Sequence, residues 1–175
     1  MRNITLMVHY VTSQICKGGQ FRLFFLKCVN AGNTTAICYE GLHVATCIGL
    51  EESIKILKPN VPTHGLSTFA VAIFNVCLGR DKEASQVFQL FVAHHADLRS
   101  EAVLDMGDSI QWLLSTFHAP LLNAYDEDFK FPDDDVIMHP KCFHGENGRN
   151  FYVGVDGSCQ NCKLYWICVN VCQML

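Results

Sequence analysis

The chain has 175 residues, of which 50% are hydrophobic and 17% are charged, and its formal net charge is −4. This composition supplies enough apolar material for one packed domain and excludes a chain that is disordered throughout. The acidic balance argues against a nucleic-acid partner, and no apolar stretch reaches the roughly 18 residues that would indicate a membrane-spanning helix.

Residues 1–19 show no sustained periodicity and are predicted to be irregular, ending in a flexible Gly18-Gly19 break. From Gln20 the apolar residues recur at helical spacing. The residues on one face of this first predicted helix are Phe21, Phe24, Phe25 and Cys28. Gly32 then predicts a helix end, and Asn33 predicts the N-cap of the next helix.

Five further helices are predicted up to residue 117. They span 33–49, 51–57, 66–78, 82–94 and about 100–117. The segment 66–78 is apolar almost all round and is expected to be the most buried. Asp81 is a predicted N-cap, and Gly107 should weaken the last helix by about 1 kcal/mol relative to Ala. The inner face of 82–94 is expected to hold Ala84, Val87, Phe88, Phe91 and Val92.

Two helix pairs resemble each other at a fixed offset. Residues 36–57 and 70–90 align at a separation of about 33 residues, which is typical of helix–turn–helix repeats. We therefore predict a mainly α fold, in which antiparallel helix pairs form a short Sel1/tetratricopeptide-like (TPR-like) array over residues 20–120.

Beyond Pro120 the composition changes. Residues 121–141 are rich in Asp and Glu and are predicted to be a solvated acidic linker. Residues 142–175 form a cysteine-rich tail, in which the aromatic and β-branched stretch 151–172 predicts a hairpin or irregular β segment.

Ten cysteines are present. Several lie within apolar helical patterns, where a thiol behaves as a small hydrophobic group. These are Cys28, Cys38, Cys47 and Cys77. This distribution favours a reduced, intracellular protein of the cytoplasm or nucleus over a disulfide-bonded secreted scaffold.

Several short motifs follow one another in a characteristic order. They are 28–33, Ala36, 39–42, 69–73, 77–79, and a final Cys159-x-x-Cys162 before a hydrophobic run to Met174-Leu175. From about residue 26 to 175, this order resembles the C-terminal part of plant F-box proteins with Sel1-like repeats. The resemblance implies the substrate-binding half of a subunit of an SCF ubiquitin ligase. In that family an N-terminal F-box docks the Skp1 adaptor, whereas residues 1–25 are too short for a three-helix F-box and lack its Leu-Pro start. Skp1 binding is therefore not expected for this chain alone.

The tail carries the strongest candidate for a metal site. Cys142 and His144 form one close pair, and Cys159 and Cys162 form another. Three thiolates and an imidazole in two pairs suit tetrahedral zinc. The alternative is that these side chains belong to a divergent tail and bind no metal. For Cys168 and Cys172, packing is the favoured interpretation.

Enzyme motifs are sparse. His144-Gly145-Glu146 with the later Cys-x-x-Cys is only superficially similar to the zinc deaminases, because the intervening chain is too short and Ser158 replaces the expected Pro. His43, His94 and His95 lie on predicted helices and are expected to be structural. We therefore predict a non-enzymatic protein–protein interaction module with an unknown protein partner. The alternatives are a degenerate ankyrin-type array, suggested by 91–98 and 112–121, and a small zinc-dependent enzyme.

Overall fold

The structure is a computed structural model that describes residues 14–140 and 161–175. Within these ranges the chain forms seven α-helices and no strand, so the prediction of a mainly α fold is confirmed. The helices are α2 (Arg22–Asn30), α3 (Thr34–Cys47), α4 (Leu50–Leu57), α5 (Gly65–Cys77), α6 (Asp81–His94), α7 (Glu101–Thr116) and α9 (Cys162–Met174), with a 3-10 turn η1 (Lys58–Asn60) after α4.

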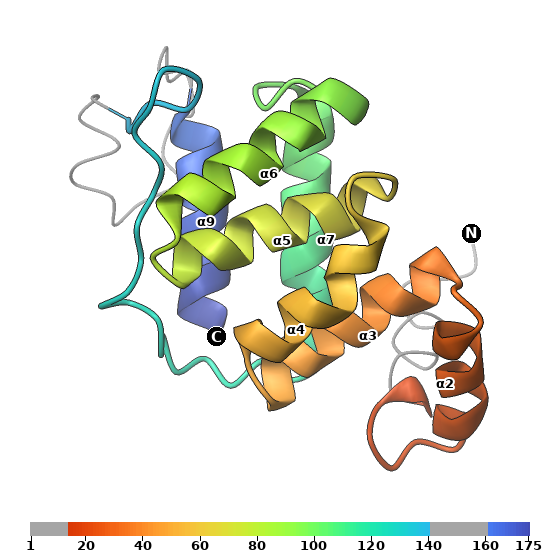
Figure 1. Cartoon of the computed structure of the whole chain (residues 1–175). Coiled ribbons are helices and arrows are strands. Elements are labelled where there is room, and N and C mark those ends of the chain that lie inside the picture. The colour runs from red at the N-terminus through yellow and green to blue at the C-terminus, as the bar shows by residue number, and fades with distance from the viewer. Residues whose placement is uncertain (1–13, 141–160) are drawn as a thin grey trace, which may run out of the picture.

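Consecutive helices pack in pairs. α3 packs along α4, and α5 packs along α6, each pair being joined by a short connection. α7 and α9 pack against each other and lie behind α5 and α6, while α2 lies at one end of the molecule (Figure 1).

The helix boundaries follow local signals in the sequence. The Asn33 side chain accepts a hydrogen bond from the Ala36 N–H at 2.9 Å, as expected of an N-cap. Gly79 has a φ of 71°, a left-handed conformation that suits glycine after the end of α5. Asp81, in contrast, is the first helical residue of α6. Arg80 occupies the N-cap, one residue before the predicted position.

α5 is the most buried helix, as the sequence predicts. Most of its residues are inaccessible, and the Phe69 ring packs on Phe88 and Phe91 of α6, with a centroid distance of 5.1 Å to Phe91. One inner-face assignment on α6 is wrong, because Val92 is 43% exposed.

The apolar face of the first predicted helix is not buried in the structure. α2 forms, but none of its residues is buried, and the preceding Phe21 is also largely exposed. Helical periodicity shows which side chains share a face, whereas burial depends on whether another element covers that face.

The predicted β structure is wrong over residues 162–172, which belong to α9. Residues 151–160 lie outside the described residues. The aromatic and β-branched composition favours strand locally, but the buried side chains of α9 recur at helical spacing against α7 and α5. They include Leu164, Ile167, Cys168, Val171 and Cys172.

The acidic segment is tied to the helices. Its carboxylates are exposed, as expected of a solvated stretch, but Phe131 and Ile137 are buried in the core. The Lys130 N–H donates to the Val76 carbonyl at 3.0 Å, and the Leu121 N–H donates to the Met174 carbonyl at 2.9 Å. Among the described residues, no helix has the length and apolarity required to cross a membrane.

Gly107 sits where α7 meets α9. A Cβ at this position would lie 2.7 Å from Cδ1 and 2.8 Å from Cγ1 of Ile167. Glycine is intrinsically unfavourable inside a helix, but here its lack of a side chain allows α7 and α9 to approach closely.

We predict that Gly107→Ala destabilises the protein by about 1–3 kcal/mol, because overpacking outweighs the gain of about 1 kcal/mol in helix propensity. Urea unfolding measures the change. Combining Gly107→Ala with Ile167→Ala should recover part of the overpacking penalty in a double-mutant cycle. A stabilised Gly107→Ala protein would contradict the close packing of α7 on α9.

Candidate functional site

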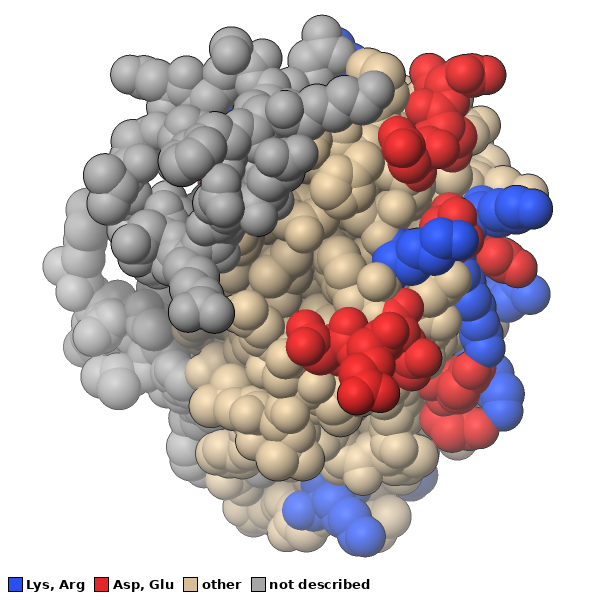
Figure 2. Space-filling model, turned by 90° about the vertical axis from the view of Figure 1, so that its left-hand side faces the viewer, with Lys and Arg blue, Asp and Glu red and all other residues tan. Residues whose placement is uncertain are grey.

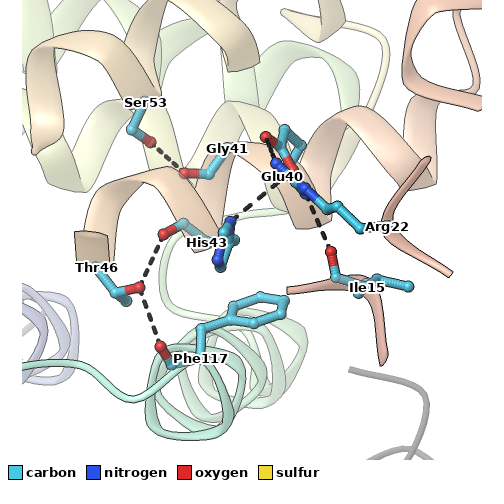
Figure 3. A network of polar contacts seen from close by, with 8 residues as sticks. All are labelled: Ile15, Arg22, Glu40, Gly41, His43, Thr46, Ser53 and Phe117. Carbon is cyan, nitrogen blue, oxygen red and sulfur yellow. Dashed lines mark hydrogen bonds and ion pairs between the residues drawn. The ribbon is translucent and has the colours of Figure 1, made fainter. Parts of the chain in front are cut away.

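A partly buried ion pair joins α2 to α3. Glu40, in the middle of α3, is only 6% exposed, and its carboxylate accepts two hydrogen bonds from Arg22, the first residue of α2 (Figure 3). Arg22 Nη2 lies 2.6 Å from Glu40 Oε1, while Nη1 donates to Oε2 and to the Ile15 carbonyl, the latter at 3.1 Å. This two-pronged geometry fixes both the position and the orientation of α2.

His43 lies one helical turn from Glu40. Its Nδ1 is 4.0 Å from Glu40 Oε2 and, among the described residues, this buried atom has no hydrogen-bond partner. The imidazole packs edge-on against Phe117 at a centroid distance of 5.6 Å. Burial lowers the pKa of His43; Glu40 acts to raise it, and Arg22 acts to lower it further.

The ion pair is the main polar attachment of α2. None of the residues of α2 is fully buried, and Phe25 packs only partly buried against the core, so we expect Arg22 to contribute strongly to the position of the helix. Removing one partner of a buried pair typically costs about 3–5 kcal/mol, because the other charge is left uncompensated. Loss of Arg22 should therefore affect α2 more than loss of any exposed side chain on it.

Two thiols lie beside the ion pair. Burial raises the pKa of Cys16 and that of Cys47, and the Glu40 carboxylate acts in the same direction on both. A raised pKa keeps a thiol protonated, whereas nucleophilic cysteines require a lowered one. The surroundings of both thiols therefore favour the protonated form. Cys47 is exposed, which differs from the expected apolar packing, whereas Cys38 and Cys77 are buried as predicted.

A second polar network stabilises the start of α5. His64 Nδ1 accepts from the Ser67 N–H at 3.2 Å and lies 2.9 Å from Ser67 Oγ, while Asn60 Nδ2 donates to the same hydroxyl at 3.0 Å. This distance would suit a serine nucleophile and its base, but Ser67 is fully inaccessible. The network therefore caps α5. Burial raises the pKa of the adjacent Cys38 to about 11.

The structure describes one of the four predicted zinc ligands. Cys162 is buried at the first position of α9, whereas Cys142, His144 and Cys159 lie outside the described residues. In the part of the chain that the structure describes, no group of three His, Cys, Asp or Glu residues could hold a metal ion. The zinc site stays a prediction.

The other tail cysteines pack in the core. Cys168 and Cys172 are buried on α9, in agreement with the predicted packing role. Contact with the Cys172 thiol, together with burial, raises the pKa of Cys77 on α5. These thiols join α5 to α9 through the interior of the protein.

The expected structural role of the histidines holds for two of the three. His43 is buried, and His95 Nε2 donates to the Pro62 carbonyl at 2.6 Å, while His94 is exposed. The sequence reasoning missed Arg22 and Glu40. The available signal was that Glu40 is the single acidic residue between positions 14 and 50, in a helix that is otherwise apolar or neutral.

The chain was compared with protein-family models, curated proteins and solved structures, and none of them matches it.

We predict that Arg22→Met raises the pKa of His43, because a cation that opposes imidazole protonation is removed while Glu40 remains. The titration of His43 followed by NMR measures this change. The same variant should lose about 3 kcal/mol of stability. Lys27→Met removes an exposed cation of the same helix and should change stability by less than about 0.5 kcal/mol. An unchanged His43 titration in Arg22→Met would contradict the proximity of the three groups.

The zinc prediction is tested on the full chain. If Cys142, His144, Cys159 and Cys162 bind one ion, the purified protein should contain one zinc per chain, and the Cys159→Ser, Cys162→Ser double variant should lose it. Metal analysis measures the zinc content, and limited proteolysis measures the expected loosening of the tail. Cys47→Ser, at an exposed thiol, is the matched control. Substoichiometric zinc in the parent protein would contradict the prediction and support the alternative, in which these side chains bind no metal.

Proposed function

We propose that this protein is a non-enzymatic protein–protein interaction module that binds its partner through α2. The observation that carries the proposal is that α2 is largely apolar, yet none of its residues is buried. Each of the other described helices, in contrast, has buried residues, and most of the large apolar side chains in those helices pack into one core.

The exposed side chains gather at the start of α2. Phe21 is 48% exposed, Leu23 is 78% exposed and Phe24 is 68% exposed. Single exposed hydrophobic residues are normal on a protein surface, whereas three large ones on neighbouring positions are typical of an interaction site. We call these three residues, with Lys17 and Lys27, the α2 surface.

The charged residues of this region indicate what kind of surface the partner should have. Lys17, four residues before Phe21, and Lys27, on α2 itself, are exposed, and α2 carries no acidic residue. The nearest acidic residue, Glu40, is buried and already paired with Arg22. The partner that fits best is a protein surface with an apolar centre and an acidic rim.

The ion pair supports this role. Arg22 and Glu40 hold α2 as a preformed helix without using its exposed apolar side chains. A preformed binding helix loses less conformational entropy on association than a disordered segment would. The buried pair thus leaves the apolar side chains available and keeps them ordered.

We also propose that the pairs α3–α4 and α5–α6 are a short array of Sel1/TPR-like repeats. The pairwise packing and the offset of about 33 residues in the sequence support this proposal. On this proposal the protein is related in function to the substrate-binding half of an F-box protein. The expected lack of Skp1 binding stays a prediction.

Phe24→Ser should abolish partner capture while leaving the fold intact, because the side chain lies outside the core. The immobilised full chain would be incubated with cell extract, and captured proteins would be quantified by mass spectrometry. Val92→Ser, which removes an exposed apolar side chain from α6, is the control and should capture the same proteins as the parent. Identical capture by all three proteins would overturn the proposal. So would binding to anionic phospholipid vesicles with no protein captured through Phe24.

A further inference from the structure

A second exposed apolar surface lies where the chain leaves α7. Leu121 is 70% exposed, Leu122 is 71% exposed and Ile48, just after α3, is 68% exposed. Two contacts hold the segment after α7 across the end of α3: Thr46 Oγ1 donates to the Phe117 carbonyl at 3.1 Å, and the Leu50 N–H donates to the Tyr125 hydroxyl at 3.4 Å. These contacts place the segment that carries the two leucines next to the end of α3, where Ile48 lies.

The backbone that presents the leucines is strained. Leu121 has a φ of 56° and Asn123 has a φ of 49°, a left-handed conformation that costs a residue with a Cβ about 1–2 kcal/mol. Asn123 Oδ1 is also buried, with no hydrogen-bond partner among the described residues. Strain of this kind persists where the surrounding structure imposes it, and it is concentrated at binding sites. Here the Leu121–Met174 backbone hydrogen bond holds the strained turn in place.

Acidic residues border these leucines. Asp126, Glu127 and Asp128 follow on the same segment and are exposed. The Asp126 N–H donates a hydrogen bond to the Asn123 carbonyl at 3.3 Å. Figure 2 shows acidic side chains, with Lys and Arg side chains among them, on the side of the molecule along which residues 121–140 run. We call Ile48, Leu121 and Leu122, with these three acidic residues, the acid-rimmed surface.

The acid-rimmed surface has the chemistry that the α2 surface requires of a partner. Each surface has three large apolar side chains at its centre, one with lysines beside it and the other with carboxylates. We propose that the partner of the α2 surface is a second copy of this chain, bound through its acid-rimmed surface. This inference rests on the proposed function of α2 and names its partner.

The pairing predicts a particular kind of assembly. Because two different surfaces meet, each copy can offer its α2 surface to one neighbour and its acid-rimmed surface to the same neighbour or to another. A two-fold dimer would contain the contact twice, and a linear assembly would contain it once per junction. Both assemblies need both surfaces, and both should weaken as salt screens the opposite charges.

The test uses full-length variants that each disable one surface. Phe24→Ser disables the α2 surface, and Leu122→Ser disables the acid-rimmed surface. Sedimentation velocity at increasing concentration should show association of the parent protein and at least about tenfold weaker association of each variant. An equal mixture of the two variants should regain association, because one intact surface of each kind is still present. Val92→Ser should associate like the parent, and circular dichroism checks that all variants are folded.

Two results would overturn this inference: a parent chain that stays monomeric up to about 100 μM, a weak limit for association, or a mixture of variants that associates no better than either alone. If the parent is monomeric while Phe24→Ser still abolishes capture of another protein, the proposed function holds and only the second copy is rejected. If Phe24→Ser changes neither association nor capture, the proposed function also fails.

Discussion

The burial of α5 determines the arrangement of the other helices. Its sequence is apolar almost all round, so no face of it can be left to water without a large loss of hydrophobic stabilisation. α6, α4, α7 and α9 all pack against it, and the buried amide of Asn75, in its last turn, donates to the Val71 carbonyl at 2.8 Å. This requirement explains why α9, which is distant in the sequence, belongs to the same core. α2 lies outside that arrangement and is held by charge instead.

The sequence was informative wherever a single residue determines a local conformation. Asn33 and Gly79 mark the limits of helices in the structure because capping and left-handed turns depend on one residue and its immediate neighbours. The same reasoning failed for residues 162–172, where packing on α5 and α7 outweighs the local preference of aromatic and β-branched residues for strand. For α2 the helical pattern is correct, but the pattern does not show that the helix has no fully buried residue.

The candidate site was harder to predict for a physical reason. Arg22 and Glu40 lie on different helices, and whether two such residues meet depends on how α2 crosses α3, which no local pattern encodes. The acid-rimmed surface has the same difficulty, because the segment that carries the two leucines is placed next to the end of α3, where Ile48 lies, only by the packing of the chain after α7 on α3. What the sequence did offer was a lone acidic residue in an apolar helix, and buried charges in proteins usually have a partner.

The position of α9 in the chain has a consequence for synthesis in the cell. About 85 residues separate the end of α5 from the start of α9, and at 5–20 residues per second the ribosome takes about 4–17 s to make them. During that interval the side of α5 that α9 covers in the finished protein has no partner from within the chain. We therefore expect the nascent protein to bind a chaperone at this stage. When many copies are synthesised at once, the uncovered side of α5 would favour aggregation.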